Sequence, residues 1–548
     1  MSERDVDVVI LGGGHNGLVC AFYLARAGLK VTVLERRSMV GGAAVTEEFH
    51  PGFRNSTASY TVSLLNPQIA ADMDLARHGL HIVDRRMSNF LPLEDGRHLA
   101  AGPGRTQAEV AKFSNRDAER LPAYEARLER VAEVLRALVL ETPPNLPDGG
   151  WREALPEMMK AGRVARRLGG LDVTARRDVL DLFTKSAGDW LDGWFESDPV
   201  KALFGFDSVV GHYASPYTPG SAYVLLHHVF GEVNGVKGAW GHAIGGMGAI
   251  TQAMAAACIE QGVDIRLDAP VAKVLTVHGR AVGAVTEGGQ IVRARAVVSN
   301  LHPRLLFDRL VDPAIVPADF RDRMAGYRSG SGTFRMNVAL SELPRFSARP
   351  EPGDHHTAGI ILAPGLDYMD RAHAQARLDG WSARPIIEML IPSTLDATLA
   401  PRGSHVASLF CQHVAPQLSD GRSWDDHRET VADLMIDTVD EWAPGFKASV
   451  LGRMALTPLD LERRFGLVGG DIFHGRLTLD QLFSARPVLG HADHRMPVPG
   501  LYLCGSGAHP GGGVTGAPGH NAAREILKDF KRRRYPGPGT GRRARHLR

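Results

Sequence analysis

A glycine-rich motif near each end of the chain limits the folds that the chain can adopt. The first motif, residues 12–17, has the spacing G-x-G-x-x-G and follows the apolar run 8–11. The second motif begins at Gly505 after the apolar run 501–504 and continues to a glycine triplet at 511–513. Each pattern predicts a buried strand, a glycine turn and the start of a helix. Two such turns in one chain can hold a long ligand at two separate points.

The first motif has the pattern of a dinucleotide-binding turn. Gly12 permits the tight turn, Gly14 lets the backbone approach a pyrophosphate, and Gly17 allows close packing of helix and strand. Residues 18–27 predict a helix whose N-terminus directs free N–H groups and a positive dipole toward the phosphates. His15, inside the loop, is expected to bond backbone or phosphate. The alternative is an ordinary glycine turn in an α/β sheet.

The residues after the next predicted strand indicate which dinucleotide is bound. That strand, residues 30–34, ends at Glu35, about 20 residues beyond the motif, where a carboxylate holds the ribose 2′-OH. An acidic side chain there repels a 2′-phosphate and argues against NADPH. Arg36 then leads to Gly41 and Gly42, a pair that resembles the second glycine motif of FAD-binding proteins. The sequence therefore predicts FAD, with a plain turn as the alternative.

Composition excludes several classes of function. With 548 residues, 44% hydrophobic and 23% charged, the chain is typical of a globular protein of more than one domain. A net charge of +2 gives no indication of a nucleic-acid partner. The four cysteines are scattered without a C-x-x-C pair, which argues against a redox-active disulfide, and no ligand cluster suggests a metal. Without a signal peptide or an 18-residue apolar run, a cytoplasmic location is expected.

Patterns along the chain predict a discontinuous organisation. A helix over 249–261 and strands over 263–267, 271–277, 281–286 and 291–299 extend the dinucleotide fold, which closes with a helix over 521–531. We therefore expect an α/β protein with a glutathione-reductase-like, FAD-binding Rossmann fold and a discontinuous α+β substrate domain. The FAD-binding domain is assigned residues 1–85, 236–304 and 466–531, the substrate domain 86–235 and 305–465, and a basic, disordered tail 532–548.

The stretch 86–235 is expected to be mainly helical, with an amphipathic helix over 121–141. Five arginines between 162 and 178 predict a solvated helix face, with a lipid-surface patch as the alternative. Peripheral contact with a membrane is therefore left open.

Four motifs together resemble one known family. They are GGGHNGLVCAFYLARAG (12–28), ERRSMVGGAAVTEEFHPGF (35–53), GAWGHAIGGMGA (238–249) and LYLCGSGAHPGGGVTGAPGHNAA (501–523). The sequence is similar to the pyridine nucleotide-disulfide oxidoreductase domain-containing protein 2 family, within the superfamily of phytoene desaturases, carotenoid isomerases and retinol saturases. The likeness covers essentially the whole chain, although the chain lacks the disulfide motif in the family's name.

This resemblance implies non-covalently bound FAD and hydride transfer with a lipophilic, isoprenoid or polyene-like substrate. It also implies an electron acceptor that is a quinone or oxygen. The implied cofactor contacts are Gly12, Gly14, His15, Asn16, Gly17, Glu35, Arg36, Gly41, Gly42, Ala43, Thr46, Val271, Gly505, Gly513 and Val514.

Two histidines near these contacts are candidate catalytic groups. His509 follows the second glycine turn, and His242 precedes the turn at Gly245. Either imidazole could act as an acid or base or tune the flavin ring, and a purely structural role is the alternative. Two other functions are kept in view. A flavin amine oxidase is disfavoured because residues 513–516 contain no aromatic side chain, and a flavin-binding regulatory or scaffold protein would need no chemistry.

Overall fold

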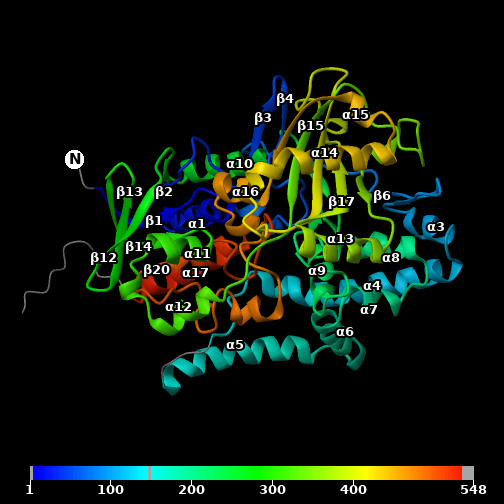
Figure 1. The fold of residues 1–548 in the computed structure, drawn as a ribbon. Coiled ribbons are helices and arrows are strands. Elements are labelled where there is room, and N and C mark those ends of the chain that lie inside the picture. Colours follow the sequence, from blue (N-terminus) through cyan, green and yellow to red (C-terminus); the bar gives the residue numbers. More distant parts are fainter. Residues whose placement is uncertain (1–3, 146–149, 533–548) are drawn as a thin grey trace, which may run out of the picture.

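The first sheet is assembled from distant stretches of the chain. The computed structural model describes residues 4–145 and 150–532, so the predicted tail beyond Arg532 lies outside the described residues (Figure 1). Ser299 of the central strand β14 lies beside Leu11 of β1 on one side and Leu503 of β20 on the other, all three strands being parallel. The two glycine motifs therefore leave the same edge of the sheet. The strands, in spatial order, are β11 (Asp264–Arg266), β2 (Val31–Leu34), β1 (Arg4–Leu11), β14 (Ile291–Ser299), β13 (Arg280–Thr286) and β12 (Val271–Val277), with β20 (Leu501–Leu503) beside β14.

Helices cover this sheet because its strands are apolar on both faces. Val8 and Ile10 pack with three helices on one face, while Val9 and Leu11 pack on the other face with residues that include Phe320. A parallel sheet needs such cover on both sides. The three helices are α1 (His15–Arg26), α10 (Met247–Glu260) and α17 (Ala517–Lys531). The predicted helices and strands of this region are confirmed, with helix starts two to four residues earlier than expected.

The second sheet is mostly antiparallel and also combines distant segments. Helix α14 (Trp424–Trp442) packs on one face, and α13 (Leu366–Asp379) packs with an all-helical segment on the other. In spatial order the strands are β19 (Val450–Leu456), β15 (Phe334–Leu340), β18 (His405–Val414), β17 (Trp381–Leu390), β16 (Gly359–Leu362), β6 (Asn89–Pro92) and β7 (His98–Ala101). The expectation of a mainly helical pattern from residue 86 was therefore wrong at its start, where β6 and β7 complete this sheet.

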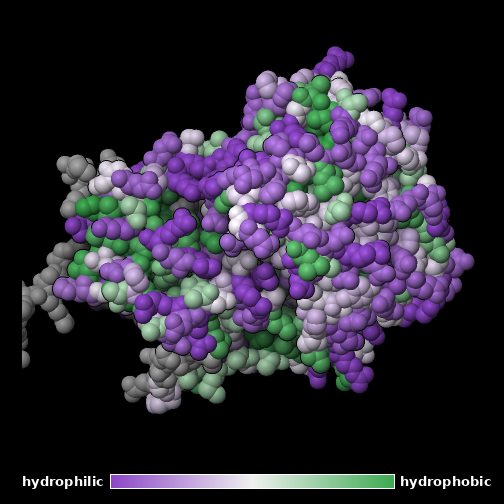
Figure 2. Space-filling model, viewed as in Figure 1, coloured by the Kyte–Doolittle hydropathy of each residue, from purple (hydrophilic) through white to green (hydrophobic). Residues whose placement is uncertain are grey.

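The helical segment lies against the second sheet, and one of its helices, α5, is largely exposed. Its helices are α3 (Thr106–Ala111), α4 (Asn115–Val139), α5 (Trp151–Gly169), α6 (Val173–Thr184), α7 (Ala187–Asp192), α8 (Asp198–Gly205) and α9 (Ser221–His228). The arginine-rich stretch is not one helix, because Asp172 caps α6 by accepting a hydrogen bond from the Ala175 amide at 2.8 Å. Helix α5 lies along the lower edge of the molecule, where apolar side chains reach the surface (Figures 1 and 2). None of the helices in the described ranges is long and apolar enough to cross a bilayer.

Shorter elements connect these layers. They are α2 (Pro67–Asp72), α11 (Pro303–Leu305), α12 (Ala318–Ala325), α15 (Phe446–Ser449) and α16 (Pro458–Phe465), with the strand pairs β3 (Thr46–His50) and β4 (Phe53–Ser56), β5 (Ile82–Asp84) and β10 (Gly241–Ala243), and β8 (Glu232–Val233) and β9 (Val236–Lys237).

An ionic cluster fastens α17 to the loop before β20. Arg495 donates to Asp529 at 2.7 Å and pairs with Glu525 at 3.0 Å, and both carboxylates are almost fully buried. Burial alone would raise the pKa of Glu525, but the charges of Arg495 and Lys528 hold it at about 2. The helix that follows the second glycine motif is thus fixed by charges that would be costly to leave unpaired.

Replacing Arg495 by methionine should destabilise the protein by about 3 kcal/mol at pH 7, because it removes the guanidinium that pairs with both buried carboxylates. In the wild type, a carboxylate whose folded pKa is about 2 contributes stability above its unfolded pKa of about 4.3 and loses it as pH falls toward 2. Urea unfolding of wild type and Arg495→Met should therefore differ most at neutral pH and converge below pH 4. The exposed Arg323→Met serves as the control, and equal stabilities at pH 7 would contradict the account.

Candidate functional site

A cavity of about 570 Å³ runs along the edge where β1 and β14 end. Both glycine motifs line it, although nearly 500 residues separate them in the sequence. Twelve of the fifteen predicted cofactor contacts line this cavity: Gly12, Gly14, His15, Asn16, Glu35, Arg36, Gly41, Gly42, Ala43, Val271, Gly513 and Val514.

The glycines of the first motif form a cradle of bare backbone. Gly12 has φ of +95°, in the region that favours glycine. A Cβ on Gly14 would lie 2.7 Å from Nδ2 of Asn300, and one on Gly42 would lie 3.3 Å from Cα of Gly14. Helix α1 begins here with Gly14 as its N-cap and no side-chain cap, so its first N–H groups are free for a ligand. This arrangement fits the diphosphate of a dinucleotide.

One end of the cavity carries the charged residues expected at an adenosine. Glu35 ends β2 and accepts hydrogen bonds from the amides of Gly13 at 2.7 Å and Arg37 at 2.9 Å. Arg36 donates to the carbonyls of Arg463 and Arg464, at the C-terminal end of α16. Its guanidinium therefore satisfies a helix terminus while its side chain forms part of the wall.

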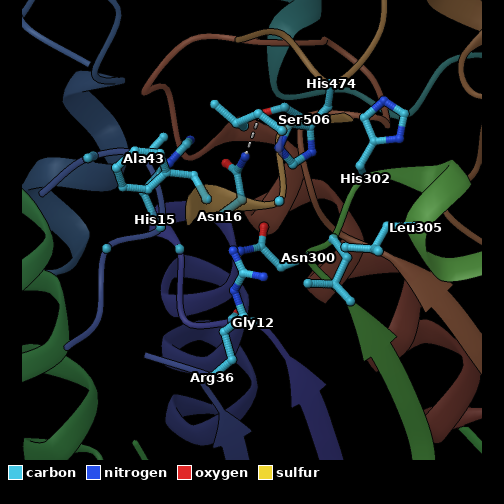
Figure 3. A pocket seen from close by; sticks show the side chains of 18 of the residues that line it. Gly12, His15, Asn16, Arg36, Ala43, Asn300, His302, Leu305, His474 and Ser506 are labelled. Carbon is cyan, nitrogen blue, oxygen red and sulfur yellow. Dashed lines mark hydrogen bonds between the residues drawn. The ribbon is translucent and has the colours of Figure 1, made fainter. Parts of the chain in front are cut away.

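At the other end, hydrogen bonds tie the two glycine motifs together. Nε2 of His15 lies 3.1 Å from the carbonyl oxygen of Gly513, and Nδ2 of Asn16 donates to Oγ of Ser506 at 3.1 Å (Figure 3). Oδ1 of Asn16 is buried without a hydrogen-bond partner in the described chain. Burial lowers the pKa of His15 to about 4, against the opposing bond to Gly513, so this imidazole is uncharged at neutral pH.

Three predicted contacts shape the site without lining it. A Cβ on Gly17 would lie 2.3 Å from the Gly12 carbonyl oxygen, which is the close helix–strand packing expected of this glycine. One on Gly505 would lie 2.6 Å from the Asn300 carbonyl oxygen. Thr46 instead accepts a hydrogen bond from the Gly248 amide at 3.0 Å. Gly17 and Gly505 therefore allow close backbone packing beside the cavity, and Thr46 holds the start of α10.

The two candidate catalytic histidines do not line the cavity. His509 is buried, with Nε2 3.3 Å from the Leu138 carbonyl oxygen, and burial lowers its pKa to about 3. His242 lies 3.1 Å from Oδ2 of Asp396, a carboxylate that also accepts from the Gly245 amide at 2.7 Å. Both side chains therefore occupy positions that suit a structural role, the alternative considered from the sequence.

Several lining residues were missed in the sequence. Asn300 follows β14 beside the first glycine turn, and its Nδ2 donates to the Gly12 carbonyl at 3.3 Å. The rule that ligands bind beyond the carboxyl ends of neighbouring parallel strands could have identified it. His302 and His474 face each other with ring centroids 5.5 Å apart (Figure 3). His474 comes from an irregular loop that gives no local pattern.

The His302–His474 pair is uncharged. Burial first, and then the charge of Arg486, lowers the pKa of His474 to about 3, and burial also brings the pKa of His302 well below its usual value. Nδ1 of His474 is buried with no partner among the residues described. Arg486 is itself fully buried and donates to the carbonyls of Phe473 at 2.7 Å and Ser506 at 2.8 Å. This guanidinium holds the His474 loop against the second glycine motif.

Two aromatic side chains close this end: Tyr60, from the loop after β4, and Phe410, from β18 of the second sheet. Tyr60 stacks on Phe410 with centroids 5.1 Å apart, and the Arg335 guanidinium lies 4.5 Å from the Tyr60 centroid. The Tyr60 hydroxyl donates to Glu388 at 2.5 Å, which directs it away from an apolar ligand. In the part of the chain that the structure describes, no group of three or more potential metal ligands is found.

Comparison with known proteins agrees with this geometry. The family model described as flavin containing amine oxidoreductase matches residues 17–334. A rat pyridine nucleotide-disulfide oxidoreductase domain-containing protein 2 is 44% identical over 96% of this chain and 94% of its own length. A limonene dehydrogenase subunit from Castellaniella defragrans is 25% identical over 97% of this chain and 96% of its own. An oxidoreductase structure from Methanosarcina mazei superposes with a TM-score of 0.58 at 18% identity, covering 96% of this chain and all of that one.

Fold and site together define an FAD-dependent oxidoreductase, as predicted. The chain belongs to the flavin-containing amine oxidoreductase family and, within it, to the group of pyridine nucleotide-disulfide oxidoreductase domain-containing protein 2. The glutathione-reductase-like fold with a discontinuous substrate domain is confirmed. The residue bounds of the two domains stay a prediction.

Gly14→Ala should weaken FAD binding at least about tenfold, a loss of about 1.4 kcal/mol. The added methyl group would lie against Asn300 in the bare cradle, which also removes the space for the diphosphate. Titration of the cofactor-free protein with FAD, followed by quenching of flavin fluorescence, measures the affinity. Gly162→Ala is the matched control, since nothing lies within 4 Å of its added Cβ. Equal FAD affinities for the two variants would argue against the cradle.

Proposed function

We propose that this protein transfers hydride between a lipophilic, isoprenoid or polyene-like molecule and FAD. The observation that carries the proposal is the distribution of charge along the cavity. The charged side chains in its wall, Glu35, Arg36, Arg37, Glu287 and Arg309, gather at the adenosine end. The opposite end is lined by neutral imidazoles and by Tyr60, Phe410, Ile472 and Phe473. Such a wall favours an uncharged, apolar substrate.

The residues of the chain would act mainly by holding and orienting the reactants. When bound, FAD supplies the hydride acceptor that an unactivated C–C bond requires. Gly12, Gly14 and the start of α1 would hold the diphosphate, and Glu35 the ribose. The N-terminus of α17, after Gly513, would stabilise negative charge that develops at this end. The apolar wall would exclude water and align the substrate.

Desaturation removes a proton as well as a hydride, so an acceptor is needed. Burial makes the His474 imidazole a weak base, so we assign the proton to solvent at the mouth of the cavity and give this imidazole a positioning role in the wall. We keep a quinone or oxygen as the final electron acceptor. The relative named as a limonene dehydrogenase subunit supports an uncharged substrate for this chain as well.

A flavin amine oxidase is the second candidate, because the matching family model carries that name. Against it, Glu35 and Glu287 are the only carboxylates among the described residues that line the cavity, and both lie at the adenosine end. At the opposite, apolar end, none of the described lining residues supplies a carboxylate to attract an ammonium group. A regulatory or scaffold role remains the third candidate, and it would leave the flavin unreactive.

Anaerobic mixing of the FAD-loaded protein with an isoprenoid hydrocarbon, squalene in detergent, should bleach the flavin absorbance, whereas a diamine should not.

Ile472→Asp places a charge in the apolar wall and should lower kcat/KM about 30-fold, which corresponds to about 2 kcal/mol. Leu479→Asp is the control because Leu479 is exposed, in the same segment. Bleaching by the diamine alone would favour the amine oxidase, and loss of activity in both variants would remove the support from the cavity wall.

We further propose a cytoplasmic protein that contacts a membrane by one face. The four cysteines are all unpaired, as expected in a reducing compartment. Trp151, Leu155, Met158 and Met159 of α5 are between 51% and 72% exposed, next to basic side chains later in the same helix (Figure 2). An apolar strip beside positive charge suits the surface of an anionic bilayer.

Met158→Glu combined with Met159→Glu should reduce the affinity for vesicles of mixed zwitterionic and anionic lipids, measured by cosedimentation, at least about twentyfold, because insertion of two exposed methionines into the lipid interface contributes roughly 2–3 kcal/mol. The control pair Asp319→Glu and Asp322→Glu, on α12, should sediment like wild type. Binding that is unaffected by the α5 changes, or equal with purely zwitterionic vesicles, would contradict this contact.

A further inference from the structure

A second cavity, of about 830 Å³, lies on the far side of the wall that closes the flavin site. It is bordered by the helical segment, the edge of the second sheet and the turn before β10. The Arg85 guanidinium, which lines this cavity, donates a hydrogen bond to Oγ1 of Thr61, which lines the first. The two cavities therefore share a wall at the Arg85–Thr61 contact.

Arg85 is a buried cation with few partners. The residue is 9% exposed, and its one side-chain hydrogen bond within the described chain goes to the neutral Thr61 hydroxyl. No described carboxylate forms a salt bridge with it; Glu388 and Tyr60 act on it only at longer range. A buried guanidinium normally has an anion bound across its fork. Here the space beside it is the second cavity.

Two other polar groups in the same wall can donate hydrogen bonds to an anion. Burial, reinforced by the charge of Glu388, raises the pKa of Asp207 to about 8, so its carboxyl group is mostly protonated at neutral pH. The Tyr124 hydroxyl is buried and has no partner in the ranges that the structure covers. His228 is uncharged, since burial lowers its pKa to about 4, and its ring stacks on Trp240.

The rest of the wall combines apolar side chains with three carboxylates, Asp84, Glu125 and Glu129. Asp84 accepts a hydrogen bond from Asn234, and Glu129 pairs with Arg136. Leucine, phenylalanine and tryptophan side chains face the same space, among them Leu121, Leu128, Leu203, Phe204, Leu225 and Trp240. At the mouth, Arg105 and Lys237 are partly exposed and already paired with Asp354 and Glu129. The occupant that matches this wall has one anionic group and an apolar body.

We propose that the second cavity binds an amphipathic carboxylate, such as a long-chain carboxylic acid, with Arg85 as the anchor of its carboxylate. The planar fork of Arg85 matches a carboxylate in two parallel hydrogen bonds. The apolar chain lies against Leu121, Leu203 and Trp240. This site is separate from the flavin cavity and does not rest on the proposed function.

The probes are dodecanoate and dodecyltrimethylammonium, which share a chain and differ in the sign of the head group. Calorimetric titration of the FAD-loaded wild type should give one dodecanoate per chain, and binding of the cation should be at least about tenfold weaker. Equal affinity for the two probes would overturn the proposal. No turnover is involved, so the result stands or falls independently of the substrate of the flavin site.

Arg85→Met should lower dodecanoate affinity at least about tenfold, as expected for the loss of a charge-assisted hydrogen bond. Arg85→Lys keeps the charge but not the fork and should lose less. The exposed Arg345→Met should bind like wild type. FAD content and thermal unfolding show whether each variant is folded. If Arg85→Met does not fold, the affinity of Arg85→Lys and the comparison of the two probes test the proposal instead. Wild-type affinity in a folded Arg85→Met would overturn the proposal.

Discussion

The close approach of α1 and α17 is the constraint on which the site depends. A Cβ on Gly519 would lie 2.1 Å from the carbonyl oxygen of Asn16, so these helices meet backbone to backbone at their first turns. Only this contact brings Gly513 within hydrogen-bond reach of His15 and Ser506 within reach of Asn16. Sheet order gives the same result, because β1 and β20 flank β14. The cavity exists where the two ends of the chain meet.

From that meeting point the cavity changes character along its length. Glu35 and its neighbours provide charge and backbone donors at one end, as a polar nucleotide requires. Beyond His15, burial suppresses ionisation, and Arg486 adds its positive charge behind His302 and His474. Burial keeps these two imidazoles neutral, and the same guanidinium that adds to this effect also holds the His474 loop in place. The chemistry open to the protein follows from this separation of a charged half from a neutral half.

Sequence patterns predicted the nucleotide-binding half of the site, because one continuous βαβ segment forms it. Gly12, Gly14 and Glu35 stand at fixed spacings within one βαβ unit, and their positions follow from strand and helix geometry alone. His474 could not be predicted, since a loop brought in by long-range packing has no periodicity to read. His509 lies near Gly513 in the sequence, which suggested the flavin, whereas the fold turns its imidazole toward the Leu138 carbonyl and outside the cavity wall; its role stays a prediction. Strands β6 and β7 form a local hairpin, but β6 gains its other partner, β16, from a segment far along the chain, and this long-range pairing left no local pattern.

The order of the segments along the chain also bears on when the site can form. Residues 4–11 pair with the strand that ends at Ser299, and that strand in turn pairs with one that begins at Leu501. During synthesis from the N-terminus, the first glycine turn leaves the ribosome nearly 500 residues before its partner. Until then the cradle has one wall, and the apolar faces of β1 and β14 lack α17. The complete cofactor site therefore forms only after synthesis has passed the second motif and α17.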